Sequence, residues 1–290
     1  MNRWEFRIVD VFTDTPLAGN QLALFENATP IPEPLLQRLA REINFAETVF
    51  LYPGDGDRDA IMRIFTPNNE IPFAGHPVLG TAVLIADGLG SDRVVLKTGQ
   101  GAVPVTIARA AGRATRGTMQ QPIPTITPYQ ETGPLFAALG IERSVLPVTL
   151  YNNGLPHLFV TLPTPDAVAA LTPDLGRLAR LAHDEGFDIV GFNVFAGAGT
   201  TWKTRMFAPA DGIAEDAATG SAAGPLALHL CRHGVVPWGT ELQISQGAEI
   251  GRPSTLFARA SGNDDAVERI EVSGFAVPVG GGWFDPNTLQ

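Results

Sequence analysis

The chain carries an internal repeat, and this repeat limits its fold more than any other feature of the sequence. Residues 63–67 read RIFTP and residues 205–209 read RMFAP, and each segment is followed by an acidic loop and a glycine. The matched pairs are 63–67 with 205–209, 37–41 with 176–180 and, more loosely, 19–24 with 153–160. Because the matches occur in the same order, they indicate a duplicated structural unit. We therefore expect two similar domains.

The region between the repeats is rich in Gly and Arg and then in Pro, from residue 110 to residue 129. We place the domain boundary there, which gives an N-terminal domain of residues 1–118 and a C-terminal domain of residues 119–290. A last strand over residues 275–290 is an alternative member of the first domain. Apolar helices that start at Pro77 and Ala222 are expected to be the buried central helix of each domain.

Composition excludes several classes of protein. With 290 residues and 44% hydrophobic composition, the chain can bury a large core. Its net charge of −10 and its lack of a basic cluster argue against a nucleic-acid partner. Apolar residues never form a run of 18, so we expect no membrane span. A single cysteine, Cys231, and an opening segment unlike a signal peptide predict a cytoplasmic protein.

Both repeats place a glycine that opens a helix with small residues, in GHP at 75–77 and in GSA at 220–222. The first N–H groups of a helix lack partners within it, and the helix dipole adds partial positive charge, so each start can bind an anion. Two related domains could direct two such starts at one small acid. Ordinary capping by Ser221 and Pro77 is the alternative interpretation of either helix.

Glu47 lies in a strand-like segment, with Phe45, Val49 and Leu51 on the same side of the strand. Apolar neighbours disfavour the charged carboxylate, which predicts that the pKa of Glu47 is raised toward the range useful for proton transfer. An edge-strand glutamate paired with an arginine is the alternative.

His76 lies at a helix entrance, which lowers a histidine's tendency to be protonated and suits a neutral imidazole. Asp216 precedes the second helix, either as an acid of the loop or as a second proton carrier. His157, His229 and His233 have no comparable setting. His229 and His233 are four residues apart, but a third ligand is missing, so we predict no metal site.

Four ordered motifs, together with DVF at 10–12 and Gly19-Asn20, resemble those of the phenazine-biosynthesis PhzF-like family over nearly the whole chain. The four motifs are FAETVF with Glu47, GHP at 75–77, EDAATGS at 215–221 and QGAEIGRPS at 246–254. The resemblance implies an α+β, diaminopimelate-epimerase-like fold. In this fold two pseudo-symmetric domains each wrap a mixed, mainly antiparallel sheet or barrel around a central helix. It also implies an active site in a cleft between the domains, with no cofactor and no metal.

The resemblance also implies roles for individual residues. Glu47 resembles the family's proton-shuttling acid and base, and His76 and Asp216 resemble groups that assist the transfer and hold the substrate. The expected substrate-binding residues are Gly75, Gly220, Ser221, Thr219 and Asn20. One departure is visible, because Ala217 stands where the family usually has proline. The related epimerases use two thiols, and Cys231 is the single cysteine of this chain, so a two-thiol racemase is excluded.

The sequence therefore predicts an isomerase without a cofactor that moves a proton on a small carboxylate-bearing metabolite, with Glu47 as acid and base. A one-base epimerase or a dehydratase of an amino or hydroxy acid is an alternative, and so is a non-catalytic binding protein that kept the fold. The expected partner is a small anionic metabolite, without nucleic acid or membrane. Assembly as a homodimer is left open.

Overall fold

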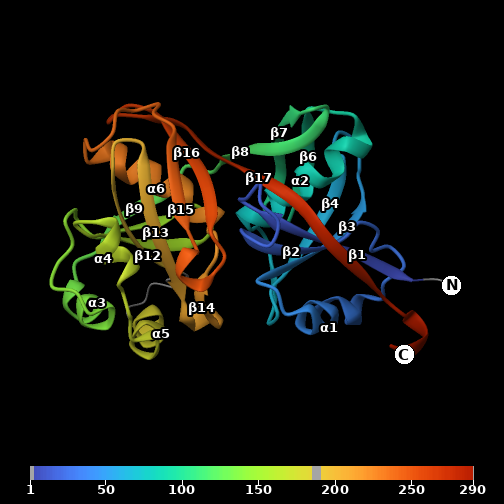
Figure 1. The fold of residues 1–290 in the computed structure, drawn as a ribbon, viewed down its shortest axis with the longest axis horizontal. Helices are drawn as coiled ribbons and strands as arrows, with labels where there is room; N and C mark the ends of the chain where they lie inside the picture. Colours follow the sequence, from blue (N-terminus) through green and yellow to red (C-terminus); the bar gives the residue numbers. More distant parts are fainter. Residues whose placement is uncertain (1–2, 185–190, 290) are drawn as a thin grey trace. The chain divides into compact units, whose positions relative to one another are not determined.

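The computed structural model describes residues 3–184 and 191–289. It divides into two compact units, one formed by Met1–Gln120 with Ser273–Gln290 and the other by Gln121–Val272 (Figure 1). Met1 and Gln290, at the ends of the predicted domains, lie outside the described residues. Within the described ranges, no helix is both long enough and apolar enough to span a membrane.

The first unit contains strands, two α-helices and one 3-10 helix. Its elements are β1 (Trp4–Val11), β2 (Asn20–Phe25), α1 (Glu33–Ile43), β3 (Glu47–Pro53), β4 (Ala60–Phe65), β5 (Glu70–Ile71), α2 (Gly75–Leu89), β6 (Arg93–Thr98), β7 (Gly101–Ala110), β8 (Arg113–Gln121), η3 (Pro286–Thr288) and the part of β17 (Val267–Phe284) from Ser273 onward. The strands pair in a closed ring, β1–β2–β3–β4–β6–β7–β8–β17, and β17 pairs with β1. Pairs β2–β3 and β4–β6 are parallel.

Helix α2 contacts strands on several sides of this ring, among them β1, β2, β6 and β7. Its residues from Gly75 to Val83 are buried without a break, which is typical of a helix enclosed by a sheet. Helix α1 is instead amphipathic. Leu35, Leu36 and Leu39 pack with Phe25 and Phe50 in a separate apolar cluster.

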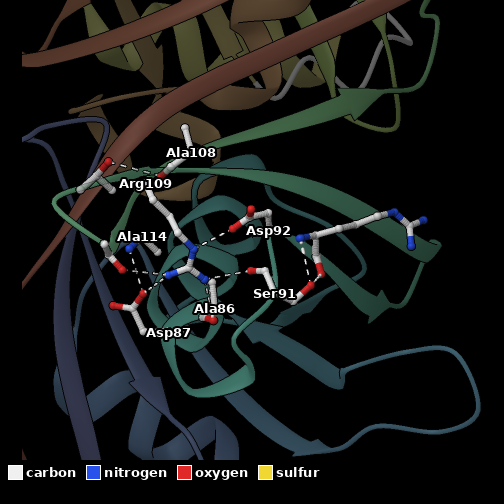
Figure 2. Close-up of polar contacts among 10 residues, drawn as sticks. Ala86, Asp87, Ser91, Asp92, Ala108, Arg109 and Ala114 are labelled. Carbon is white, nitrogen blue, oxygen red and sulfur yellow. Dashed lines mark hydrogen bonds and ion pairs between the residues drawn. The ribbon is translucent and has the colours of Figure 1, made fainter.

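The C-terminal end of α2 is held by Arg109 of β7 (Figure 2). The Arg109 guanidinium donates to the carbonyl oxygens of Ala86 and Ser91 and to the carboxylates of Asp87 and Asp92. These carboxylates raise the pKa of Arg109. Because the last carbonyls of a helix lack intrahelical donors, a cation at this position satisfies one of them and complements the helix dipole.

The second unit contains strands, four α-helices and two 3-10 helices among its described residues. Its elements are β9 (Thr125–Pro128), α3 (Thr132–Leu139), β10 (Thr149–Asn152), β11 (Pro156–Thr161), α4 (Pro165–Ala169), α5 (Leu175–Asp184), β12 (Gly191–Ala198), β13 (Thr201–Ala208), η1 (Pro209–Asp211), β14 (Ile213–Asp216), α6 (Gly220–Arg232), β15 (Leu242–Gln246), η2 (Ala248–Ile250) and β16 (Ser254–Gly262).

The strand pairings of the first unit recur in the second with the same directions. Antiparallel β1–β2, β3–β4, β4–β5 and β6–β7 correspond to antiparallel β10–β11, β12–β13, β13–β14 and β15–β16. The parallel pairs β2–β3 and β4–β6 correspond to β11–β12 and β13–β15. The RIFTP and RMFAP motifs lie on the matched strands β4 and β13 and extend just past them. The sequence repeat is therefore a repeat of strand topology.

Helix α6 corresponds to α2 in this order, and it is buried from Gly220 to Cys231 and packs on β16. Both helices begin two residues earlier than the sequence analysis expected, at Gly75 and Gly220. The Gly- and Pro-rich stretch between residues 110 and 129 is another difference, because it forms strands β8 and β9. Its prolines lie at the ends of β9 or outside the two strands, so they interrupt neither one.

Candidate active site

In the first unit, the predicted catalytic pair is in contact. Glu47 begins β3, and His76 lies in the first turn of α2, with His76 Nε2 located 3.5 Å from Glu47 Oε2. Both side chains are mostly enclosed, with exposed fractions of 4% for His76 and 14% for Glu47. Strand β2, which starts at Asn20, runs parallel to β3, and Leu22 is paired with Glu47. Asn20 is buried at the same end of these two strands.

The contact between His76 and Glu47 is not an ion pair. Burial lowers the pKa of His76 to about 3, and a hydrogen bond from the ring to the backbone of Gln21 opposes this shift. The imidazole is therefore neutral near pH 7. Because Nε2 makes no hydrogen bond to the described residues, the bond to Gln21 comes from Nδ1. The Nε2 lone pair then faces the Glu47 carboxyl group.

In the second unit, Asp216 ends β14, and a three-residue loop joins it to helix α6. Thr219 Oγ1 donates to Asp216 Oδ2 over 2.7 Å, and both side chains are buried. Gln246, at the end of β15, joins this group. Its Nε2 donates to Thr219 Oγ1 and to the carbonyl of Asp216, each at 2.9 Å, and its Oε1 accepts from Thr219 N. The loop that enters α6 is thus fixed by one glutamine.

Ser221, in the first turn of α6, contacts a buried histidine. Its Oγ lies 2.9 Å from His157 Nε2, and Asn193 Nδ2 lies 3.3 Å from His157 Nδ1. Burial lowers the pKa of His157 to about 4, so this ring is also neutral near pH 7. The residues next to His157 in the sequence do not mark it as a site residue. Its partners are 64 and 36 residues away in the chain, so no local pattern could reveal them.

The predicted site residues therefore form two groups, one in each unit. Asn20, Glu47, Gly75 and His76 lie at one end of the first barrel, at the starts of β2, β3 and α2. Asp216, Thr219, Gly220 and Ser221 lie around the start of α6. Sequence reasoning missed Gln246 as a member of the second group, although this glutamine opens one of the quoted motifs. Across residues 3–184 and 191–289, no cluster of three or more His, Cys, Asp or Glu side chains could hold a metal ion.

The chain is similar in sequence to proteins of a known family. The family model for phenazine biosynthesis-like proteins, PhzC-PhzF, matches residues 9–282. The chain belongs to this family. Among its PhzC-PhzF relatives, the chain is 46% identical over 275 residues to a trans-2,3-dihydro-3-hydroxyanthranilate isomerase of Pseudomonas fluorescens, covering 95% of the chain and 97% of the relative. A Pseudomonas aeruginosa protein of the same name is 46% identical over 267 residues, with coverage of 92% and 94%.

Solved structures of PhzC-PhzF proteins have the same fold. A PhzF-family phenazine biosynthesis protein from Bacillus anthracis has a TM-score of 0.86 and 22% identity, over 98% of this chain and 100% of that one. A protein of Pseudomonas aeruginosa described as a predicted epimerase has a TM-score of 0.81 and 28% identity, over 98% and 99%. The expected α+β, epimerase-like fold is confirmed. The named relatives also confirm that the chain is an isomerase.

Proposed function

We propose that this isomerase moves a proton between two carbon atoms of a small carboxylate, with Glu47 as the group that removes and returns the proton. The proposed substrate is trans-2,3-dihydro-3-hydroxyanthranilate, the acid after which its relatives are named, or a close analogue. The two groups of site residues would bind one substrate molecule in a cleft between the domains. The observation that carries the proposal is the 3.5 Å contact between Glu47 and a buried, neutral His76.

Proton balance explains why one carboxyl group is sufficient. An isomer has the same formula as its parent, so the proton taken from one carbon must be replaced at another. Glu47 takes the proton as a carboxylate and returns it as a carboxylic acid. The lone pair on His76 Nε2 can accept a hydrogen bond from the acid form of Glu47, which gives the proton-carrying state of Glu47 a partner.

Binding of the substrate carboxylate is assigned to the starts of the two central helices. Gly75 and Gly220 begin α2 and α6, and neither helix has a side-chain cap at its start. Their first N–H groups are therefore suited to a ligand anion. Ser221 adds a hydroxyl group beside the second helix start. These fixed dipoles would hold the substrate and stabilise negative charge that develops on it when the proton leaves.

The decisive experiment compares the wild-type chain with Glu47→Gln on trans-2,3-dihydro-3-hydroxyanthranilate. The amide keeps the size of the side chain and its hydrogen bonding but cannot carry the proton. We expect turnover to fall by at least about a hundredfold, while affinity for the acid is retained. Mass spectrometry of reactions in D₂O detects deuterium in the product when the proton on Glu47 exchanges with solvent before its return.

A matched control is Glu42→Gln, which makes the same chemical change on an exposed residue of α1. This variant should turn over as the wild type does. Normal turnover by Glu47→Gln would contradict the assignment of the base, and Asp216 would then be the next candidate. If the wild type neither isomerises this acid nor exchanges its carbon-bound protons, the proposed substrate is wrong.

A further inference from the structure

We propose that His157, held by Asn193, fixes the hydroxyl group of Ser221 as a hydrogen-bond donor toward the substrate. His157 is then a positioning residue that acts through Ser221 and sets which chemical group the second domain accepts. This inference rests on the proposed function, because Ser221 is a substrate ligand only in that function. The contacts that support it lie within the second unit.

The orientation of the Asn193 amide follows from its neighbours. Nδ2 of this buried side chain lies 3.2 Å from the carbonyl oxygen of Gly191 and 3.4 Å from that of Leu158. Carbonyl oxygens can only accept hydrogen bonds, so the atom that faces them is the NH₂ group. The same NH₂ group lies 3.3 Å from His157 Nδ1. The nitrogen that faces it must accept.

The tautomer of His157 is thereby determined. A proton on Nδ1 would point at the NH₂ donor of Asn193, so Nδ1 carries the lone pair. The exposed fraction of His157 is 1%, and burial keeps the ring neutral near pH 7. A neutral imidazole has one N–H group, so the proton is on Nε2. Nε2 therefore donates to Ser221 Oγ across the 2.9 Å contact.

A serine hydroxyl that accepts from His157 still has its own hydrogen to donate. No residue in the described part of the chain accepts that hydrogen. Ser221 is 5% exposed and lies in the first turn of α6, so its hydrogen is available at the helix start to which we assign the substrate carboxylate. A group that accepts hydrogen bonds is favoured there, and a second donor such as an ammonium is disfavoured.

Nitrogen-15 NMR of the histidine rings tests the tautomer directly and does not depend on turnover. We expect the wild-type His157 ring to be neutral with its proton on Nε2 at pH 7. Asn193→Ala, which removes the donor to Nδ1, should let the two tautomers mix. A wild-type ring protonated on Nδ1, or on both nitrogens, would overturn the proposal, whatever the enzyme turns over.

A double-mutant cycle tests the consequence for binding of trans-2,3-dihydro-3-hydroxyanthranilate. Ser221→Ala should raise KM roughly tenfold with little change in kcat, as expected for one lost hydrogen bond to a charged group. His157→Phe keeps a ring in the same space, removes the donor, and should raise KM by a similar or smaller factor. Because His157 acts through Ser221, the double variant should be no worse than Ser221→Ala. If the factors by which the two single substitutions raise KM multiply in the double variant, His157 acts independently of Ser221, and the proposal fails.

The matched control is His229→Phe, because His229 is equally buried in the same unit but contacts Tyr151 and not Ser221. It should lose stability and keep a wild-type KM. If His229→Phe raised KM as much as His157→Phe does, the increase would come from general destabilisation of the unit, and the positioning role of His157 would be refuted. A failure of the proposed function gives a different result, because the wild-type enzyme would then not convert trans-2,3-dihydro-3-hydroxyanthranilate. The NMR experiment would still determine the tautomer of His157 in that case.

Discussion

Asn153 Nδ2 donates a hydrogen bond to the main-chain carbonyl of Ser221 across 2.9 Å. This carbonyl would normally accept from the N–H group four residues later, but that residue is Pro225, which has none. A side chain from the loop between β10 and β11 thus replaces the hydrogen bond that α6 lacks. The first turn of α6, which presents Ser221, depends on a residue outside the helix.

Asn153→Ala should lower the free energy of unfolding by about 1–3 kcal/mol, because it leaves the Ser221 carbonyl buried without its donor. Pro225→Ala restores the main-chain N–H, so adding it to Asn153→Ala should recover most of the loss. Urea unfolding of the two single variants and the double variant measures the coupling. Strictly additive changes would show that Asn153 does not substitute for the missing helical bond.

The two copies of the repeat contain equivalent ion pairs that differ in burial. Arg63 pairs with Glu70 of β5, and Arg205 pairs with Glu215 of β14. The Arg205 side chain is 9% exposed and its partner 8%, whereas Arg63 is 26% exposed and Glu70 42%. Arg205 also donates to three main-chain carbonyls at the end of α4 and just beyond it.

We therefore expect Arg205→Ala to destabilise the fold by about 3–5 kcal/mol, because a buried carboxylate loses its partner. The equivalent change Arg63→Ala should cost less than about 1 kcal/mol, since water can solvate the groups that it leaves. Chemical denaturation of both variants provides the comparison. Equal losses would contradict the assignment of the difference to burial.

Stability should fall steeply in mild acid because of three buried histidines. Burial lowers the pKa of His76 and His229 to about 3 and that of His157 to about 4. Below about pH 6.5 the unfolded chain protonates these rings and the folded chain does not, so the stability present above pH 6.5 is lost as the pH falls toward 4. Each ring contributes a slope of about 1.4 kcal/mol per pH unit.

The test is the pH dependence of urea unfolding between pH 4 and pH 7. His229→Phe removes one of the three rings, and its slope in this window should be smaller than that of the wild type by about 1.4 kcal/mol per pH unit. Above pH 7 the wild type and the variant should have parallel curves. An unchanged slope would mean that His229 takes up its proton in the folded protein over the same pH range as in the unfolded chain.

Thr219 should stabilise the loop that carries Asp216. Thr219→Val removes the hydroxyl that donates to Asp216 Oδ2 and accepts from Gln246 Nε2, and we expect a loss of about 1.5–3 kcal/mol. The control Thr204→Val removes a longer contact, 3.4 Å, to the neutral carbonyl of Val194, and should cost clearly less. Similar losses in thermal unfolding of the two variants would contradict the stabilising role assigned to the Thr219 hydroxyl.

The repeat and the helix starts could be predicted because their signals are local. RIFTP and RMFAP match in residue order, and Gly75 and Gly220 each follow such a motif and open an apolar segment. The exact first residues were not predicted, since α2 and α6 begin two residues earlier than expected, and neither start has a side-chain cap that would mark it. Strands β8 and β9 were missed because their composition resembles that of a linker, whereas pairing with distant strands decides their structure.

In the candidate site, too, contacts between residues distant in the sequence could not be predicted. The motifs indicated Glu47 and His76, and the structure brings them into contact, although their roles remain proposals. His157 and Gln246 matter through partners on other strands and helices, and a single sequence does not specify such contacts. Cytoplasmic location and a homodimer stay predictions from composition and resemblance.

Strand β17 has a consequence for how the chain is built during translation. Its residues from Ala276 to Phe284 pair with β1, so the first unit needs residues made after the whole of the second. The unit that contains β1 therefore cannot complete its strand pairing until Gln121–Val272 and then Ala276–Phe284 have been synthesised. Domains usually fold in the order of their synthesis. Here the later-made unit can complete its strand pairing first, and until β17 is made the edge of β1 lacks the partner that protects it from wrong pairing.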